Sequence, residues 1–154
     1  MRRLLMVAAV VAIIAVLSIG TVAQPPPCTP SKTTISLYPG CRQLVQPGQQ
    51  DCFVAKVYEY YPTGGLGVVD EGIVFFIDNN TNSVLGTASL NSYGYAVGCF
   101  KIKFDVDVYA FFLALQASGA PVMDTVGPLC SSHSQGIDVD VENNPALHGC
   151  GPGS

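Results

Sequence analysis

The chain has 154 residues, of which 49% are hydrophobic and 12% are charged, and its formal net charge is −4 at pH 7. This length is enough for one domain with its own core and short for two. Of the seven lysines and arginines, two lie at positions 2 and 3, which leaves five against eleven acidic residues. The composition therefore excludes a basic nucleic-acid-binding surface.

The N-terminus is typical of a secretory signal peptide over residues 1–23. Arg2 and Arg3 precede an apolar run, residues 4–17, and small residues permit cleavage after Ala23. A retained membrane anchor is the alternative, because residues 4–23 are long enough to cross a bilayer. Either reading places the domain outside the cell, secreted or at the cell surface. A proline-rich linker, residues 24–32, leads into it.

Strand signals outnumber helix signals in the rest of the chain. Segments rich in Val, Ile, Tyr and Phe end at turns that contain Gly, Pro, Asn and Asp, which is the pattern of β-strands. The expected strands cover residues 33–37, 51–61, 72–78, 83–90, 95–104, 106–116 and 137–141. A helix over residues 108–117 is the alternative for the sixth segment, but the alternation from Val106 to Tyr109 favours a strand.

This spacing of short strands and turns predicts an all-β fold, a β-sandwich over residues 33–117. Residues 118–154 then form a C-terminal tail with one strand, held to the sandwich by disulfides.

Four of the expected strand segments resemble the bacterial Ig-like domain family, which occurs as repeats in surface proteins and adhesins. They are GIVFFID at 72–78, VLGTASL at 84–90, GYA at 94–96 and VYAFF at 108–112. The resemblance covers residues 33–116 and implies an Ig-like β-sandwich of about seven strands. It also implies that Gly86 and Gly94 serve backbone geometry.

Three features depart from the family pattern. The loop over residues 60–71 is longer, the G-x-H approach to the last strand is missing, and the cysteines and the tail are extra. These departures concern the edges of the sandwich and its use as a repeat, and they leave the sandwich itself in place.

The register that the resemblance implies divides each strand into two faces. Val74 and Phe76 would point into the core, and the alternate residues would point outward. The strands expected at residues 72–78 and 106–116 would lie side by side in one sheet. Their outward residues would therefore form an apolar outer face: Ile73, Phe75, Ile77, Tyr109, Phe111 and Leu113. A sheet face in water normally alternates with polar residues, so we expect a cover for this one. Three possibilities stay open: the tail (residues 121–150), a partner subunit, or a helix at 108–117 that would remove the face.

All six cysteines lie after residue 23, and an even number in an exported chain predicts three disulfides. In the register of the resemblance, Cys52 and Cys99 occupy outward positions of neighbouring strands, so we expect these two to pair. For the remaining four, we expect Cys130 to pair with Cys150 around the tail strand, and Cys28 with Cys41 around the first strand.

Catalytic and metal-binding signals are weak. Cys130 and His133 have the spacing of part of a blue-copper loop, but no upstream histidine completes the ligand set, and the only other histidine is His148. The serines around His133 lie outside any nucleophile elbow. The acids at 105, 107, 138, 140 and 142 lack EF-hand spacing and are expected on solvated strand faces. We therefore expect no enzyme activity, metal or cofactor.

The expected function is an extracellular structural or adhesive module, such as a surface or filament subunit. It would act by packing of the apolar face or by strand addition. Its partners would be other subunits or cell-surface components, with self-association, and the membrane only if the N-terminal segment is retained.

The alternative is a soluble, secreted binding module for a small ligand or glycan. Its platform would be Tyr58, Tyr60 and Tyr61, beside the loop over residues 60–71. Asn79 begins an Asn-Asn-Thr sequon on an expected turn and is a candidate glycosylation site.

Overall fold

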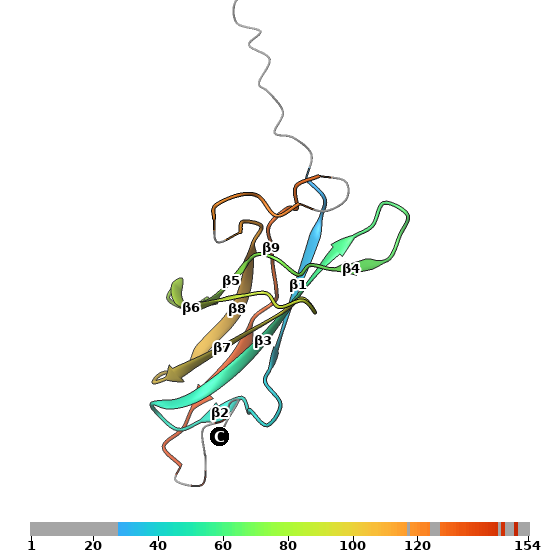
Figure 1. The fold of residues 1–154 in the computed structure, drawn as a ribbon. Helices are drawn as coiled ribbons and strands as arrows, with labels where there is room; N and C mark the ends of the chain where they lie inside the picture. The colour runs from blue at the N-terminus through green and yellow to red at the C-terminus, as the bar shows by residue number, and fades with distance from the viewer. Residues whose placement is uncertain (1–27, 117, 124–126, 145, 147–149, 151–154) are drawn as a thin grey trace, which may run out of the picture.

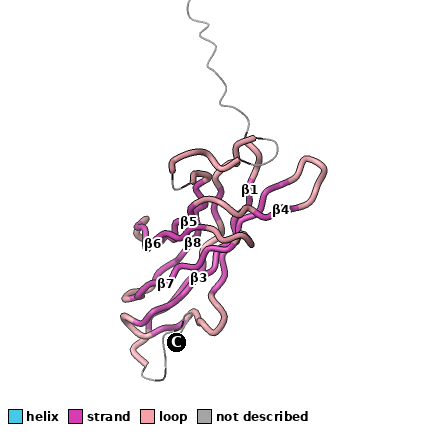
Figure 2. Tube along the Cα trace, viewed as in Figure 1, coloured by secondary structure: helices cyan, strands magenta, loops and turns pink. Residues whose placement is uncertain are grey.

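The structure is a computed structural model that describes residues 28–116, 118–123, 127–144, 146 and 150. These residues form ten strands and no helix (Figure 2). The strands are β1 (Ser31–Leu37), β2 (Leu44–Val45), β3 (Gln49–Tyr60), β4 (Leu66–Val68), β5 (Ile73–Asp78), β6 (Ser83–Ser89), β7 (Tyr95–Ile102), β8 (Val106–Leu113), β9 (Ser132–His133) and β10 (Ile137–Val141).

The strands form two sheets that pack face to face as a β-sandwich (Figure 1). In the first sheet β3 lies between β1 on one side and β7 and β4 on the other. The second sheet has the order β2-β10-β8-β5-β6, with β9 also paired to β8. β1, β3 and β7 thus face β6, β5, β8 and β10, which is the strand distribution of an Ig-like sandwich.

All seven predicted strands are present, and the predicted all-β sandwich is confirmed. The helix considered for residues 108–117 is excluded, because Val106–Leu113 is β8 and pairs with β5 from Ile73↔Leu113 to Asp78↔Val108. The three unpredicted strands, β2, β4 and β9, have only two or three residues each. The predicted signal peptide and residues 24–27 of the linker lie outside the described residues.

The core lies between the sheets and is built from one side of each long strand. Phe53 of β3, Phe76 of β5 and Phe112 of β8 are fully buried. Phe100 of β7 joins this group, with its ring centroid 5.4 Å from that of Phe76 and 6.3 Å from that of Phe53. Burial of apolar side chains at about 25 cal/mol per Å² is the main force that holds the two sheets together.

Two of the glycines fit around these rings and one shapes a turn. A Cβ on Gly86 or on Gly98 would lie 2.5 Å from the ring of Phe100, so neither position has room for a side chain. Gly94 has φ of 76°, the left-handed conformation predicted for the turn before β7. Gly86 does not have a positive φ; it lies at the register shift between β5 and β6, and its lack of a Cβ leaves room for the Phe100 ring.

The three disulfides are Cys28–Cys130, Cys41–Cys150 and Cys52–Cys99. The predicted Cys52–Cys99 bridge is confirmed, and it joins directly paired residues of β3 and β7. The two other expected pairings, Cys130 with Cys150 and Cys28 with Cys41, are wrong. The observed Cys28–Cys130 and Cys41–Cys150 bridges each join the N-terminal part of the domain to the tail.

The physical reason for these pairings is that the start of the domain and the tail lie side by side. Thr29 bridges Leu129 in parallel, and the Cys130 N–H donates to the Thr29 carbonyl over 2.9 Å. Nearness in sequence therefore does not indicate which cysteines meet in space. Three disulfides are typical of a chain that folds in an oxidising compartment. None of the described residues forms a helix of the length and apolarity that a membrane crossing needs.

Candidate functional site

The six residues of the predicted apolar face lie together on the outer side of the second sheet. They form three directly opposed cross-strand pairs between β5 and β8: Ile73↔Leu113, Phe75↔Phe111 and Ile77↔Tyr109. The rings of Phe75 and Phe111 have centroids 6.4 Å apart at a tilt of 55°. Such opposed pairs stabilise a sheet by about 0.2–1 kcal/mol each, so the face also holds β5 against β8.

Burial separates the two faces of these strands. Val74, Phe76, Val108, Ala110 and Phe112 on the inner face are fully buried. Every outward residue of the six is half-buried, with part of its side chain exposed to solvent. The apolar outer face is therefore an accessible surface at the centre of the sheet.

The described strands of the tail do not lie over this face, as one possibility from the sequence required. Its strands β9 and β10 pair with the edge of β8, so they widen the second sheet within its own plane. Val122 and Leu129 of the tail are buried as part of the core. Among the described residues, the tail therefore borders the apolar outer face.

An open hollow of about 440 Å³ lies where the tail meets the face. Its lining combines two aromatic residues of β8 with residues of the tail and of the β5–β6 turn: Tyr109, Phe111, His133, Ser134, Gly136 and Asn79. The face thus ends on one side in a shallow depression with hydrogen-bonding groups.

The loop serines near His133 hold the tail in place. Ser134 is buried, accepts a hydrogen bond from the Ala110 N–H over 2.9 Å and donates to the Gln135 carbonyl over 2.8 Å. The Ser132 hydroxyl lies 2.7 Å from those of Ser31 and Thr33, which ties β9 to β1. These partners give the serines a structural role.

The copper interpretation fails on the chemistry of Cys130. Its sulfur is bonded to Cys28 and cannot act as a thiolate ligand. His148, the second histidine, lies outside the described residues.

Of the five acids singled out in the sequence, Asp138, Asp140 and Glu142 are exposed as expected, and the other two make structural contacts. Asp105 accepts from the Val141 N–H over 2.7 Å, and Asp107 accepts from the Asn79 side-chain amide over 2.9 Å. Asn79 itself is exposed on the β5–β6 turn.

The three tyrosines of the predicted ligand platform do not form one surface. Tyr58 and Tyr60 point to the same side of β3 by alternation, whereas the Tyr61 hydroxyl packs against Gly67. The structure brings Tyr58 instead toward Tyr95 of β7. The Lys56 Nζ lies 5.0 Å from the Tyr58 ring centroid and 4.4 Å from that of Tyr95, and it donates to the Tyr95 hydroxyl over 2.9 Å.

Lys56, Tyr58 and Tyr95 form a cluster in which the Lys56 ammonium lies near both tyrosine rings. Hydrogen bonding to Tyr95 is the main cause that raises the pKa of Lys56, so the ammonium stays charged at neutral pH. No local sequence pattern predicts this contact, because Lys56 and Tyr95 are 39 positions apart and meet only through the β3–β7 register.

Asp51 belongs to no sequence motif. It lies on the inward side of β3, shares that side with Phe53, and is fully buried. Burial raises its pKa to about 6, although the Cys52 amide N–H acts in the opposite direction. The signal available in the sequence was its parity: an acidic residue two positions before a core Phe on one strand must face inward.

No protein-family model matches the chain, and no curated protein matches it either. The resemblance to bacterial Ig-like domains stays a prediction, and the fold rests on the structure.

Proposed function

We propose that this protein is a non-catalytic extracellular structural or adhesive module that assembles through the apolar outer face of β5 and β8. The observation that supports the proposal most is the three apolar cross-strand pairs, half-buried and uncovered by the described tail. A contiguous apolar patch on an otherwise soluble domain is typical of a protein–protein contact. The three disulfides fit a module that stays folded outside the cell.

Strand addition is a second route to the same kind of assembly. In the described part of the chain, β6 pairs only with β5 and β7 only with β3, so each leaves an open sheet edge. The β5–β6 pairing is interrupted by a register shift between Phe76 and Ile77, which makes the β6 edge irregular. β7 is therefore the better edge for an added strand.

The test is the assembly state of the purified, oxidised protein, measured by light scattering after size exclusion and by electron microscopy. We expect oligomers or filaments in the wild type. Phe75→Glu and Phe111→Glu would each place a charge in the contact and raise the apparent Kd by ~30-fold or more.

Phe104→Glu is the matched control. Phe104 is 77% exposed and lies in the turn between β7 and β8, outside the apolar outer face and outside every strand, so its substitution leaves both routes of assembly intact. Thermal unfolding of all three variants separates loss of contact from loss of fold. A wild type that stays monomeric at high concentration would contradict the proposal, as would equal dispersal by Phe104→Glu.

A second candidate function, binding of a small ligand or glycan, is favoured by the cluster of Lys56, Tyr58 and Tyr95. Partly exposed tyrosine rings offer flat apolar surfaces, and an ammonium group between them supplies hydrogen-bond donors. A monomeric wild type in the assembly test would make this candidate the better account.

A further inference from the structure

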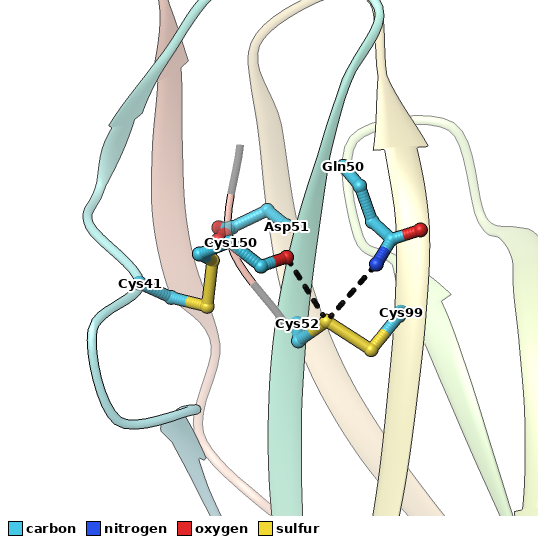
Figure 3. The surroundings of a disulfide bond; sticks show 6 residues. All are labelled: Cys41, Gln50, Asp51, Cys52, Cys99 and Cys150. Carbon is cyan, nitrogen blue, oxygen red and sulfur yellow. Dashed lines mark hydrogen bonds between the residues drawn. A yellow bond between two sulfur atoms is a disulfide. The ribbon is translucent and has the colours of Figure 1, made fainter. Parts of the chain in front are cut away.

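The buried carboxyl group of Asp51 lies against a disulfide whose two cysteines are half-buried. Its Oδ1 is 2.8 Å from the Sγ of Cys150, which is bonded to Cys41 (Figure 3). Its Oδ2 is buried and has no hydrogen-bond partner among the described residues. Asp51 itself is 0% exposed. A buried polar atom without a partner is costly, so this arrangement needs a physical explanation.

The position of the hydrogen explains the contact. Both sulfurs of a disulfide lack hydrogen, so the close approach of Oδ1 to Sγ can be a hydrogen bond only if Asp51 carries the proton. The burial that raises the pKa of Asp51 favours this protonated form. Among the described residues no charged side chain contributes to that shift. Arg42, next to Cys41, and Lys101, beside the neighbouring Phe100 on β7, are exposed.

Cys150 is held in this position by contacts with β3. Its N–H donates to the Gln50 carbonyl over 3.0 Å, and its carbonyl oxygen lies 3.5 Å from the Cys52 Sγ. Figure 3 shows the Cys41–Cys150 disulfide beside β3, whereas the Cys52–Cys99 disulfide runs from β3 to β7. Only the first of these has a carboxyl group at one sulfur among the described residues.

We propose that the Cys41–Cys150 disulfide and Asp51 form a thiol–disulfide exchange site for an external dithiol, in which Asp51 transfers the proton of the Cys150 sulfur. This inference is independent of the assembly proposed above. It assigns to the buried carboxyl a chemical role that the fold alone does not require.

The exchange begins with attack of one thiolate of the dithiol on the Cys41 Sγ. The bond between the Cys41 and Cys150 sulfurs breaks, a mixed disulfide forms on Cys41, and the electron pair leaves on the Cys150 Sγ. Asp51 gives its proton to that sulfur. The resulting carboxylate then accepts a hydrogen bond from the Cys150 S–H.

The second thiolate of the dithiol completes the reaction. It attacks the dithiol's own sulfur in the mixed disulfide, and Cys41 leaves as a thiolate that takes a proton from water. The protein disulfide is reduced by two electrons, and the dithiol is oxidised to its disulfide. In the reverse direction the Asp51 carboxylate removes the proton from Cys150 before the bond forms again.

The first experiment is reduction of the oxidised full-length protein by dithiothreitol between pH 5 and 8, with alkylation and mass spectrometry to identify the opened disulfide. Each rate is divided by the thiolate concentration of the reagent. We expect Cys41–Cys150 to open first, with a normalised rate about 10-fold higher below pH 6 than above pH 7.

Asp51→Asn keeps the shape of the side chain but cannot transfer a proton, and it should abolish this pH dependence. Asp78→Asn is the control, since Asp78 is also buried but bonds to the Asn80 N–H and to Thr81. Equal normalised profiles for wild type and Asp51→Asn would overturn the proposal, and so would earlier opening of another disulfide.

A second measurement needs no substitution and holds even if Asp51→Asn fails to fold. Carbon-detected NMR titration of the Asp51 carboxyl compares the protein with Cys41–Cys150 oxidised and reduced. The reduced Cys150 thiol donates to the carboxylate, so we expect the pKa of Asp51 to fall on reduction. An unchanged pKa would show that the two groups are not coupled and would overturn the inference.

Discussion

At the scale of single residues, Asp51 shows how burial alone alters a side chain. Its neighbours are Phe53 on the same side of β3 and a disulfide, and in the part of the chain that the structure describes one of its oxygens has no partner. Sequence parity places Asp51 inward, but only the fold shows that a cysteine 99 positions away covers it. Contacts of that range depend on the path of the whole chain.

Asp51 makes the stability of the oxidised protein dependent on pH. Its pKa is about 6 in the folded state against an ordinary value of 3.8, so the folded state binds more protons between these values. The free energy of unfolding should therefore fall as pH rises from about 4 to 6, by at most about 3 kcal/mol, and stay low above it. The free energy of unfolding of Asp51→Asn should change less over this pH range.

Urea unfolding at five pH values from 4 to 8, without reductant, measures both proteins. The difference between the two curves isolates Asp51 from the other titrating groups. Parallel curves would show that the Asp51 carboxyl is as well solvated in the folded protein as in the unfolded chain.

At the scale of elements, the alternation of residues in the sequence correctly predicted which face of a strand is buried. β5 and β8 have their inner and outer faces as expected, because a period of two residues is set by strand geometry itself. β2, β4 and β9 were missed, since a segment of two or three residues carries too little pattern and exists only through its pairing partner. The same reason explains the cluster of Lys56 and Tyr95.

Packing of the Phe100 ring between the sheets leaves no room for a side chain at Gly98. A Cβ on Gly98 would lie 2.5 Å from the Phe100 ring and 2.7 Å from the Phe76 ring. Both rings are held in the core, so Gly98→Ala should lower the free energy of unfolding by about 1–3 kcal/mol. Gly127→Ala is the control, because a Cβ there meets nothing within 4 Å and φ is not positive. Equal unfolding midpoints in urea for the two variants would contradict this account.

At the scale of the whole molecule, two disulfides hold the tail to the start of the domain. Cys28–Cys130 and Cys41–Cys150 close sequence separations of 102 and 109 residues, whereas Cys52–Cys99 closes 47. The sequence predicted that the cysteines form disulfides, and the strand register predicted one pair. The other pairs depend on the return of the tail beside β1, which no local pattern reports.

Because the tail runs back beside β1, the Cys28–Cys130 disulfide links the two sheets at one edge of the sandwich. β1 belongs to the first sheet and β9 to the second, and besides the bridge they share the hydroxyl contacts of Ser132 with Ser31 and Thr33. Replacing both cysteines by Ala should lower the free energy of unfolding by ~4 kcal/mol through the entropy of the unfolded chain. It should also release β9 locally, since two residues of strand cannot hold the edge alone.

Hydrogen exchange distinguishes the two effects. In the Cys28→Ala, Cys130→Ala protein, protection should fall most at residues 129–134, more than global destabilisation accounts for. The Cys52→Ala, Cys99→Ala protein is the control, because that bridge lies within the first sheet and its loss should lower protection without singling out β9. If both variants lose protection evenly along the chain, β9 is held by the sheet itself. The apolar outer face would then keep its border with the tail even without the disulfide.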